Sequence, residues 1–336
     1  MRAFVLALSL TMPLGANAQD RGPILSDAIE AHILPGYSAL SDSTNALADA
    51  ARANCDPNST PLRNAYNDAF DDWISVGHLR FGPSEAEDRA FALAFWPDTK
   101  GFTPKALSGL ISTEDTAIQS PDAFAETSVA GRGFFALELM LYDPRFTDLG
   151  GAEYRCALMQ AITADINRNA AAIDADWADY ARALASPGEN SPYRTEDEAM
   201  QELYKALTTG LEFTAETRLG RPMGSFDRPR PKRAEARRSE RSLRHVELSL
   251  IALRDLAARL AADHPDIAAD LDDAFAAAID RAQSLDDPAF AGVATPQGRL
   301  RVEALQQSIN DIRAIASTEL GPTLGINAGF NSLDGD

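Results

Sequence analysis

Apolar residues recur with the 3.6-residue period of an α-helix along nearly the whole chain. Alanine is abundant, runs of β-branched residues are rare, and no segment alternates between apolar and polar residues as a half-buried strand does. This pattern predicts an all-α fold. The expected long helices cover residues 24–54 (kinked at Pro35 and Gly36), 61–80, 153–185, 195–218, 234–262, 266–285 and 295–320.

A linker is expected at residues 186–192, SPGENSP, because proline and glycine punctuate this stretch. With roughly four long helices on each side of it, the chain favours two four-helix-type bundles packed side by side. We expect residues 19–187 to form the first bundle. Residues 188–336 then form the second bundle and a C-terminal tail.

Residues 81–120 depart from the bundle pattern, because they are rich in proline, glycine and aromatic residues. They are expected to form a long excursion with short helices. Its aromatic side chains can cap the first bundle, or they can form a surface that docks onto a transport partner. These side chains are Phe81, Phe91, Phe95, Trp96 and Phe102.

The first 18 residues have a basic start, a short apolar core and the small-x-small cleavage site Ala16-Asn17-Ala18. This pattern is typical of a secretory signal peptide and is too short for a membrane span. No cysteine follows the apolar core, so no bacterial lipoprotein anchor is indicated. No later run approaches the roughly 20 apolar residues of a spanning helix. We therefore expect export to a bacterial periplasm.

The cysteine content fits this expectation. Only Cys55 and Cys156 are present, and an even count in an exported protein predicts a disulfide between them. Two free buried thiols are the alternative. Such a disulfide would tie together two distant segments of the first bundle.

The chain is strongly acidic, with 50 acidic and 31 basic residues, a net charge of −19 and a pI near 4.6. A surface of this charge disfavours nucleic acid and anionic membranes as partners. Acidity of this kind is also a common solubility trait, so it does not by itself indicate a cation site.

One carboxylate interrupts an otherwise apolar segment. In GFFALELMLY, residues 133–142, Glu138 is the single charged residue, and a helix there would be apolar around most of its circumference. A buried carboxylate needs a cation, a metal or hydrogen-bond donors, or else it takes up a proton. A neighbouring arginine is the simplest partner.

A second polar interruption is WISVGHLRFGP, residues 73–83. His78 and Arg80 lie close to the expected helix C-terminus, where cations suit the local negative potential. That structural role accounts for Arg80 and in part for His78. Both residues are also candidates for a ligand site.

The third interruption lies at residues 221–245, where nine basic and three acidic residues give a local charge of +6. The apolar stripe of the expected helix 234–262 extends backwards onto Glu235, Ser239 and Ser242. A stripe that turns polar in its first turns favours a polar pocket over a solvated basic face. Arg238 and Arg241 are then candidate counter-ions of Glu138.

These segments resemble the imelysin-like family of exported bacterial proteins. The resemblance rests on HLRFGP at 78–83, RPRPKRAEARRSERSLR at 228–244, LGINAGFNSLDGD at 324–336, and GFFALE at 133–138, which aligns with the family's Gly-x-His-x-x-Glu motif. It implies two helical bundles with a cleft between them, and an association with bacterial iron acquisition. It also implies a proposed metallopeptidase activity in which the motif's His and Glu bind the metal.

The chain departs from that motif at its histidine, which is Phe135 here, while Glu138 is kept. Phenylalanine cannot bind a metal, and one carboxylate is not a metal site. No His-Glu-x-x-His motif and no recognisable nucleophile arrangement is present either. These observations favour a protein that is not a peptidase.

Three functions follow from the sequence. The leading one is a periplasmic protein of iron uptake that binds a small molecule or iron species in a polar pocket between the bundles. The second is direct binding of iron or another divalent metal by Glu138 and His78, with Glu85 as a neighbour, or a metallopeptidase on that site. The third is docking onto a component of an iron-transport system. The expected pocket residues are His78, Arg80, Glu138, Glu235, Arg238, Ser239, Arg241 and Ser242, with Asn327, Asn331 and Asp334 of the tail closing the pocket.

Overall fold

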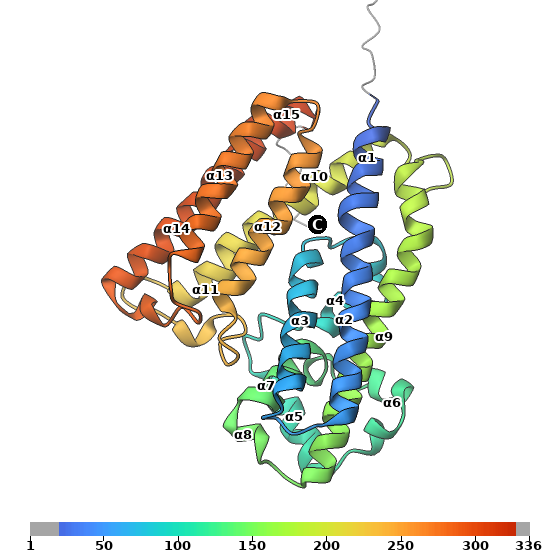
Figure 1. Cartoon of the computed structure of the whole chain (residues 1–336), viewed down its shortest axis with the longest axis vertical. Helices are drawn as coiled ribbons and strands as arrows, with labels where there is room; N and C mark the ends of the chain where they lie inside the picture. The colour runs from blue at the N-terminus through green and yellow to red at the C-terminus, as the bar shows by residue number, and fades with distance from the viewer. Residues whose placement is uncertain (1–19, 327–336) are drawn as a thin grey trace, which may run out of the picture.

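The computed structural model describes residues 20–326, and no β-strand is present among them. The predicted all-α fold is confirmed. Figure 1 shows the helices in two groups, which we call the first bundle (helices before residue 186) and the second bundle (helices after residue 195). The expected signal peptide, 1–18, lies outside the described residues.

The first bundle is dominated by a long N-terminal rod and by α9. The rod is α1 and α2 joined without a break by a π-helical turn, Ile29–Ile33. Pro35 has no backbone N–H to donate to a carbonyl oxygen one turn earlier. This accounts for the π-helical turn just before it. The main helices are α1 (Gly22–Ala28), α2 (Leu34–Ala53), α3 (Thr60–Val76), α7 (Gly133–Tyr142) and α9 (Ala152–Ala185). The short ones are α4 (Arg89–Leu93), α5 (Phe102–Thr113), α6 (Pro121–Ala125) and α8 (Pro144–Thr147).

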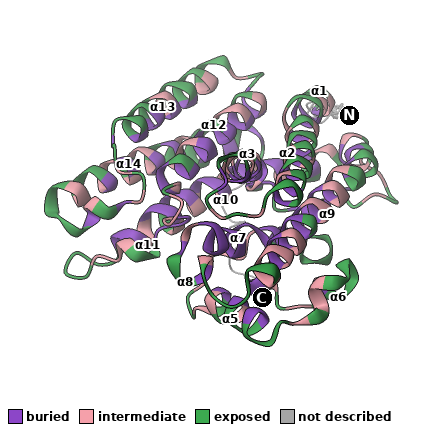
Figure 2. Cartoon of the chain, turned by 60° about the horizontal axis from the view of Figure 1, so that its bottom comes forward, coloured by how far each residue is buried: buried purple, intermediate pink, exposed green. Residues whose placement is uncertain are grey.

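Helix α7 lies at the centre of the molecule, and nine of its ten residues are buried. Figure 2 shows it as an almost unbroken buried segment among helices whose outer faces are exposed. Its apolar circumference is filled by aromatic neighbours: Phe134 stacks on Phe70 with ring centroids 4.6 Å apart. The helix that carries Glu138 is therefore surrounded by protein on nearly all sides.

Cys55 and Cys156 form the predicted disulfide, with Cα atoms 5.2 Å apart and a sequence separation of 101. The bond joins the segment after α2 to the first turns of α9. Since α2 and α9 already pack along their lengths, the disulfide fixes one end of this helix pair.

The second bundle is built from four long segments. π-Helical turns, 213–219 and 316–320, extend α10 and α14. Together with α13, the helices α10, α12 and α14 enclose a core that includes Phe275 and Phe290. The helices are α10 (Glu196–Glu212), α11 (Gly220–Met223), α12 (Ser242–Leu260), α13 (Pro265–Gln283), α14 (Pro296–Ile315) and α15 (Gly321–Thr323).

The two bundles meet mainly where α12 packs on α3. The N-terminal helix α1 extends beyond its own bundle and packs on α10 and α12 as well. Arg21, just before α1, is buried. Its backbone N–H donates to Glu196 (2.8 Å), and its Nη2 donates to the carbonyl oxygen of Leu324 (2.7 Å). The start of the described chain is thus fastened to one end of the second bundle, where the first residues of α10 and the segment after α15 meet.

Two predicted helix boundaries were wrong. Helix α3 ends at Val76, not near Arg80, and Tyr37 and Ser84 donate hydrogen bonds to the carbonyl oxygen of Leu79. Helix α12 begins at Ser242, not at residue 234. The residues expected to form its first turns are irregular, because Glu138 of the first bundle accepts the backbone N–H groups of Arg238 and Ser239.

None of the helices within residues 20–326 is long and apolar enough to cross a membrane.

Candidate functional site

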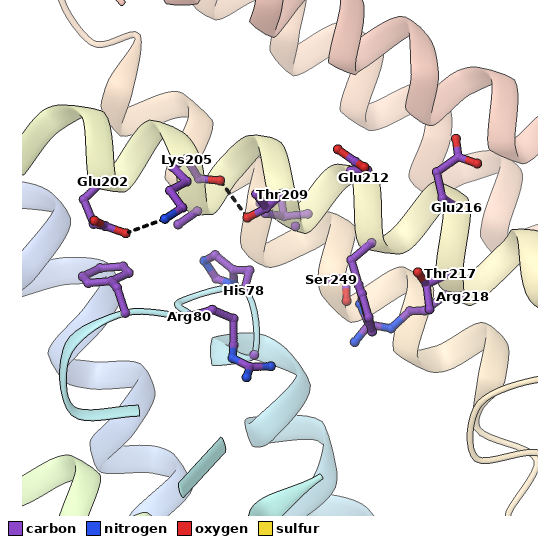
Figure 3. A pocket seen from close by; sticks show the side chains of 16 residues that line it. His78, Arg80, Glu202, Lys205, Thr209, Glu212, Glu216, Thr217, Arg218 and Ser249 are labelled. Atoms are coloured by element: carbon purple, nitrogen blue, oxygen red, sulfur yellow. Dashed lines mark hydrogen bonds and ion pairs between the residues drawn. The ribbon is translucent and has the colours of Figure 1, made fainter. Parts of the chain in front are cut away.

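A pocket of about 370 Å³ lies between the bundles. The segment after α3, residues 77–81, forms its floor on the first-bundle side, and α10 with its π-helical extension forms the opposite wall. Two residues of α12, Ser249 and Leu253, complete it. Figure 3 shows side chains from all three segments pointing toward this space.

The pocket depends on a close approach between the end of α3 and α10. At Gly210 of α10, a β-carbon would lie 2.7 Å from Leu253 Cδ2 and 3.0 Å from His78 Cβ. Real Cβ contacts are rarely this short, so only glycine lets His78 lie against α10 at this point. The apolar walls include Phe81, Phe213 and Leu253.

His78 is the inner end of a hydrogen-bonded chain that begins at the half-exposed Asp255. Asp255 Oδ2 lies 2.7 Å from His32 Nδ1, and His32 Nε2 lies 2.9 Å from His78 Nε2. Because the carboxylate can only accept, His32 carries its proton on Nδ1. When both rings are neutral, His78 Nε2 donates to His32, and His78 Nδ1 is left as an acceptor.

Burial lowers the pKa of His78 well below its usual value, and the nearby His32 and Arg218 lower it further. His78 is therefore neutral at neutral pH. Its Nδ1 is buried, and none of the described residues offers it a hydrogen-bond partner. Ser249 Oγ, in the same pocket, is also buried and without a partner among residues 20–326. Unpaired buried polar atoms are uncommon, and here two of them belong to residues that line one pocket.

The charged side chains around the pocket are paired with one another. Lys205 lies 3.9 Å from Glu202 within α10. Arg80 contacts Glu85 at 2.5 Å. Glu212 and Glu216 both face Arg313 of α14, at 3.5 and 3.3 Å.

Arg218 is held by a buried carboxylate behind the pocket wall. Its Nε donates to Glu235 Oε2 at 2.7 Å, and its Nη1 lies 3.4 Å from Thr214 Oγ1. His245 Nδ1 lies 3.1 Å from the same carboxylate oxygen. Burial alone would raise the pKa of Glu235, but Arg218 and His245 lower it to about 2. Glu235, one of the expected pocket residues, thus positions Arg218 and does not itself line the cavity.

Glu138 forms a separate contact between the bundles. Its Oε1 accepts hydrogen bonds from the backbone N–H of Arg238, the backbone N–H of Ser239 and the hydroxyl of Ser239, each at 2.9 Å. Burial raises the pKa of Glu138, and these donors oppose that rise. This carboxylate accepts the backbone N–H groups of Arg238 and Ser239, which were expected to form hydrogen bonds within the predicted helix. Ala236 and Glu240 adopt positive φ angles of 42° and 58° in the resulting irregular segment.

The prediction that Arg238 or Arg241 is the counter-ion of Glu138 holds only in part: the charge of Arg238 lowers the pKa of Glu138, but neither guanidinium pairs with this carboxylate. The guanidinium of Arg238 donates to Asp143 Oδ2 at 2.5 Å, and that of Arg241 pairs with Asp71. Ser242 donates its hydroxyl to the carbonyl oxygen of Glu235. The basic segment 221–245 therefore meets carboxylates of the first bundle, and its Arg and Ser residues fasten the bundles together.

The structure thus divides the expected site residues into two groups. His78 and Arg80 line the pocket, whereas Glu138, Arg238, Ser239, Arg241 and Ser242 form the interbundle contact, with Glu235 between the two. Asn327, Asn331 and Asp334 lie outside the described residues.

The metal site implied by the family motif does not fit the residues around Glu138. Phe135, at the position of the motif's histidine, packs edge-on against Phe70 at 5.3 Å. One Glu138 oxygen, Oε1, accepts from two N–H donors and one O–H donor, which repel a cation at that oxygen. Over residues 20–326, no three His, Cys, Asp or Glu side chains are grouped to hold a metal ion. Glu138 does not line the pocket that His78 lines.

The aromatic residues of the 81–120 excursion have different environments. Phe81 packs edge-on against Trp177 at 5.6 Å, and Trp96 contacts Phe135 and Phe213. Phe91 and Phe102 are each 46% exposed. The first group caps the bundle interface, and the second lies on the surface.

Sequence reasoning missed several pocket residues. Ser249 breaks the apolar stripe of α12 between Val246 and Leu253, which is the same signal that drew attention to His78. His32 and Asp255 carry no local signal, because they meet 223 residues apart. The acidic and basic residues of α10 resemble those of any solvated helix face.

Comparison with known proteins agrees with this architecture. The imelysin family model (peptidase M75) matches residues 33–316. Iron-regulated protein A of Synechococcus elongatus is 23% identical over 300 residues, covering 82% of this chain and 79% of that protein.

Two solved structures have a similar fold. One is an imelysin-like protein from Psychrobacter arcticum, with a TM-score of 0.78 and 19% identity, covering 97% of this chain and 100% of the other. The second is a putative iron-regulated protein A precursor from Parabacteroides distasonis, with a TM-score of 0.68 and 14% identity, covering 91% and 94%. Because the family model spans residues 33–316, most of the chain, the protein belongs to the imelysin family.

Proposed function

We propose that this imelysin-family protein acts in the bacterial periplasm in iron uptake, as a binding protein that holds a small ligand or iron species in the pocket beside His78. The iron association rests on the family and on a relative named as iron-regulated protein A. The disulfide between Cys55 and Cys156 supports an oxidising compartment such as the periplasm.

The observation that carries the proposal is the pair of unsatisfied polar atoms. His78 and Ser249 both line the cavity, and each carries a buried polar atom, Nδ1 and Oγ, that lacks a partner among the described residues. Leaving such atoms unpaired costs free energy, which a ligand with matching groups recovers on binding. Pockets of about 300–1,000 Å³ with mostly apolar walls and a few convergent polar groups are typical of small-molecule sites.

A thermal-shift screen of metal ions, iron chelates, haem, organic acids and neutral organic compounds tests this function. A ligand of the folded state raises the melting temperature by mass action. A compound that stabilises the protein should lose its effect in His78→Ala and Ser249→Ala. His264→Ala and Ser317→Ala serve as matched controls, because neither residue lines the pocket. The proposal is wrong if every stabilising compound acts equally on pocket and control variants.

We also propose that the protein is not a peptidase. Phe135 replaces the motif's histidine, and three donors already bind Glu138 Oε1, so a metal at that oxygen would have to displace them. Purified protein incubated with unfolded casein and Zn²⁺ should release no peptides above a Glu138→Gln control. Cleavage that depends on Glu138 would contradict this.

Docking onto an iron-transport component is a second candidate function. Phe91 and Phe102 are large, apolar and 46% exposed, and Arg80 and Lys100 lie over their rings at 5.3 and 5.9 Å. Exposed aromatic–cation pairs of this kind are common in binding surfaces. A pull-down from periplasmic extract with wild type and with Phe91→Ser/Phe102→Ser tests it, with exposed Leu300→Ser as control. Equal recovery of every partner by wild type and double variant rejects this surface.

A further inference from the structure

Six of the nine basic residues at 221–245 have no ion-pair partner within residues 20–326. Arg238, Arg241 and Arg244 pair with Asp143 and Asp71. The other six stay unpaired although the chain has 50 acidic and only 31 basic residues, so carboxylates are not in short supply. We call these six the basic patch: Arg221, Arg228, Arg230, Lys232, Arg233 and Arg237.

Backbone hydrogen bonds hold the patch residues on one short folded segment. After α11 the chain makes a tight hairpin, in which the N–H of Arg228 donates to the carbonyl oxygen of Ser225 at 3.0 Å. The N–H of Arg230 then donates to the carbonyl oxygen of Pro222 at 2.8 Å, which returns the chain to α11. Asp227, within this hairpin, is exposed and forms no ion pair with the patch. Figure 2 shows an exposed loop beside α11.

The positive charges of the patch repel one another. Burial and the charge of Arg233 both lower the pKa of Arg221, and no carboxylate of the described residues pairs with either side chain. Both remain cations at neutral pH, because a guanidinium is not deprotonated there. Arg237 is fixed nearby, since its Nε donates to the carbonyl oxygen of Lys232 at 3.2 Å. Folding therefore gathers like charges, and bound carboxylates would relieve the repulsion.

An exposed aromatic side chain lies in the same hairpin. Phe226 is 73% exposed, more than any other large apolar side chain of the described residues. Arg299 of α14 lies 5.8 Å from the centre of its ring and donates to the carbonyl oxygens of Met223 and Ser225 at 2.6 and 3.1 Å. The hairpin is thus fixed on α14 before any partner binds, which lowers the ordering cost of binding.

The charge of the whole chain narrows the partner. The patch is a local positive area on a protein whose net charge is −19. A membrane or a nucleic acid presents negative charge over a wide area, so it would also face the acidic remainder of the surface. A protein segment with a few clustered carboxylates can match the patch alone.

We propose that the basic patch and Phe226 form a docking surface for an acidic segment of a partner protein, whose carboxylates pair with the patch and whose apolar side chain covers Phe226. This goes beyond the proposed function, because none of these residues lines the pocket beside His78.

Fluorescence anisotropy with short labelled peptides tests the surface on the full folded protein. The probe is rich in glutamate and contains two leucines. One control peptide replaces every glutamate by glutamine, and another replaces both leucines by serine. The acidic probe should bind, and its affinity should fall at least about tenfold between about 50 and 500 mM NaCl, since salt screens exposed charges. The glutamine peptide should not bind.

A charge-reversal variant assigns binding to the patch. Arg228→Glu/Lys232→Glu/Arg233→Glu changes three exposed side chains, so the fold should be kept. The affinity for the acidic probe should fall at least about tenfold, because attraction becomes repulsion at three positions. The melting temperature of the variant checks that it is folded.

Two further variants complete the test. Arg52→Glu/Arg182→Glu/Arg194→Glu changes the net charge equally at exposed positions on α2, on α9 and before α10. Its affinity should stay within about twofold of wild type, because these charges are remote from the patch. Phe226→Ser should weaken the leucine-containing probe about threefold and leave the affinity for the serine peptide unchanged.

Four results would overturn the proposal. They are no binding of the acidic probe, an equal loss in the two charge-reversal variants, displacement of the probe by an equimolar amount of citrate, and tighter patch-dependent binding to phosphatidylglycerol vesicles than to the probe. The third would indicate a site for small anions and the fourth a membrane surface. None of them bears on the pocket, whose ligand screen depends on His78 and Ser249.

Discussion

Glu138 and Ser239 join the two bundles through a single carboxylate oxygen, which accepts both the backbone N–H and the hydroxyl of Ser239 at 2.9 Å. A third donor, the N–H of Arg238, completes its shell. The residue that a family motif assigns to a metal thus has a structural role in this chain, where it stabilises an irregular segment of the second bundle.

Replacing Glu138 tests that role. Glu138→Ala leaves three donors buried without an acceptor and should lower the free energy of unfolding by about 3 kcal/mol. Glu138→Gln keeps an oxygen at the same place, so it should cost about 1 kcal/mol or less. Guanidinium chloride unfolding measures both. Equal losses in the two variants would show that charge, not hydrogen bonding, fixes the segment.

The helices could be predicted from the sequence because helical periodicity is a local signal. Helix α9 was expected at residues 153–185 and spans Ala152–Ala185. Boundaries failed where distant groups compete for backbone hydrogen bonds. No local sequence pattern indicates that the Tyr37 hydroxyl donates to the carbonyl oxygen of Leu79, or that Glu138 accepts the backbone N–H of Ser239.

The site was predicted only in part, for the same reason. His78 was recognisable as a polar residue on an apolar stripe, and it does line the pocket. The Arg and Ser residues at 238–242 were recognised as unusual but belong to the bundle contact, since their partners Asp71 and Asp143 carry no sequence signal. The hydrogen-bonded chain from Asp255 through His32 to His78 could not be predicted, because its residues lie far apart in the sequence.

Gly210 provides a second prediction. Alanine in place of a helical glycine usually stabilises by about 0.5–1 kcal/mol. Gly109→Ala in α5 should do so, because nothing lies within 4 Å of the added Cβ. Gly210→Ala should instead destabilise by about 1–2 kcal/mol, because its Cβ would be 3.0 Å from His78 Cβ. Thermal unfolding compares the pair, and a stabilised Gly210→Ala would mean that His78 moves freely.

The buried pair of Arg218 and Glu235 supplies a third prediction. Glu235→Leu alone leaves a buried guanidinium unpaired and should cost about 3–5 kcal/mol. The double variant Arg218→Met/Glu235→Leu should recover most of that loss, since both charges are removed together. A double-mutant cycle by chemical denaturation gives the coupling energy. Additive effects of the two single variants would contradict a direct pair.

The pH dependence of stability is a fourth prediction. Burial lowers the pKa of both His78 and His245 below the ordinary value of 6.5. Above pH 6.5 these rings are neutral in both the folded and the unfolded chain, so they do not change the free energy of unfolding with pH. Below it the unfolded chain binds protons that the folded chain excludes. Each ring should then lower the free energy of unfolding by up to about 1.4 kcal/mol per pH unit.

Unfolding midpoints between pH 7.5 and 5.5 measure this slope. Glu138, whose pKa is raised, contributes with the opposite sign, whereas Glu235, whose pKa is lowered to about 2, contributes with the same sign and mainly below this pH range. The test is therefore the difference between wild type and His78→Gln. The variant should lose about half of the histidine-dependent slope, whereas His264→Gln should keep all of it. An unchanged slope in His78→Gln would show that the ring is accessible to solvent protons.

The contact of Arg21 with Leu324 has a consequence for the order in which the protein can be completed. A chain delivered from its N-terminus presents Arg21 among the first residues, yet the carbonyl oxygen it reaches lies 303 residues later. Helix α1 also packs on α10 and α12. Helix α1 can pack on α9 within the first bundle, but its contacts with α10 and α12 form only after those helices exist, and the bond of Arg21 to Leu324 forms last. The first bundle is therefore completed only by the second.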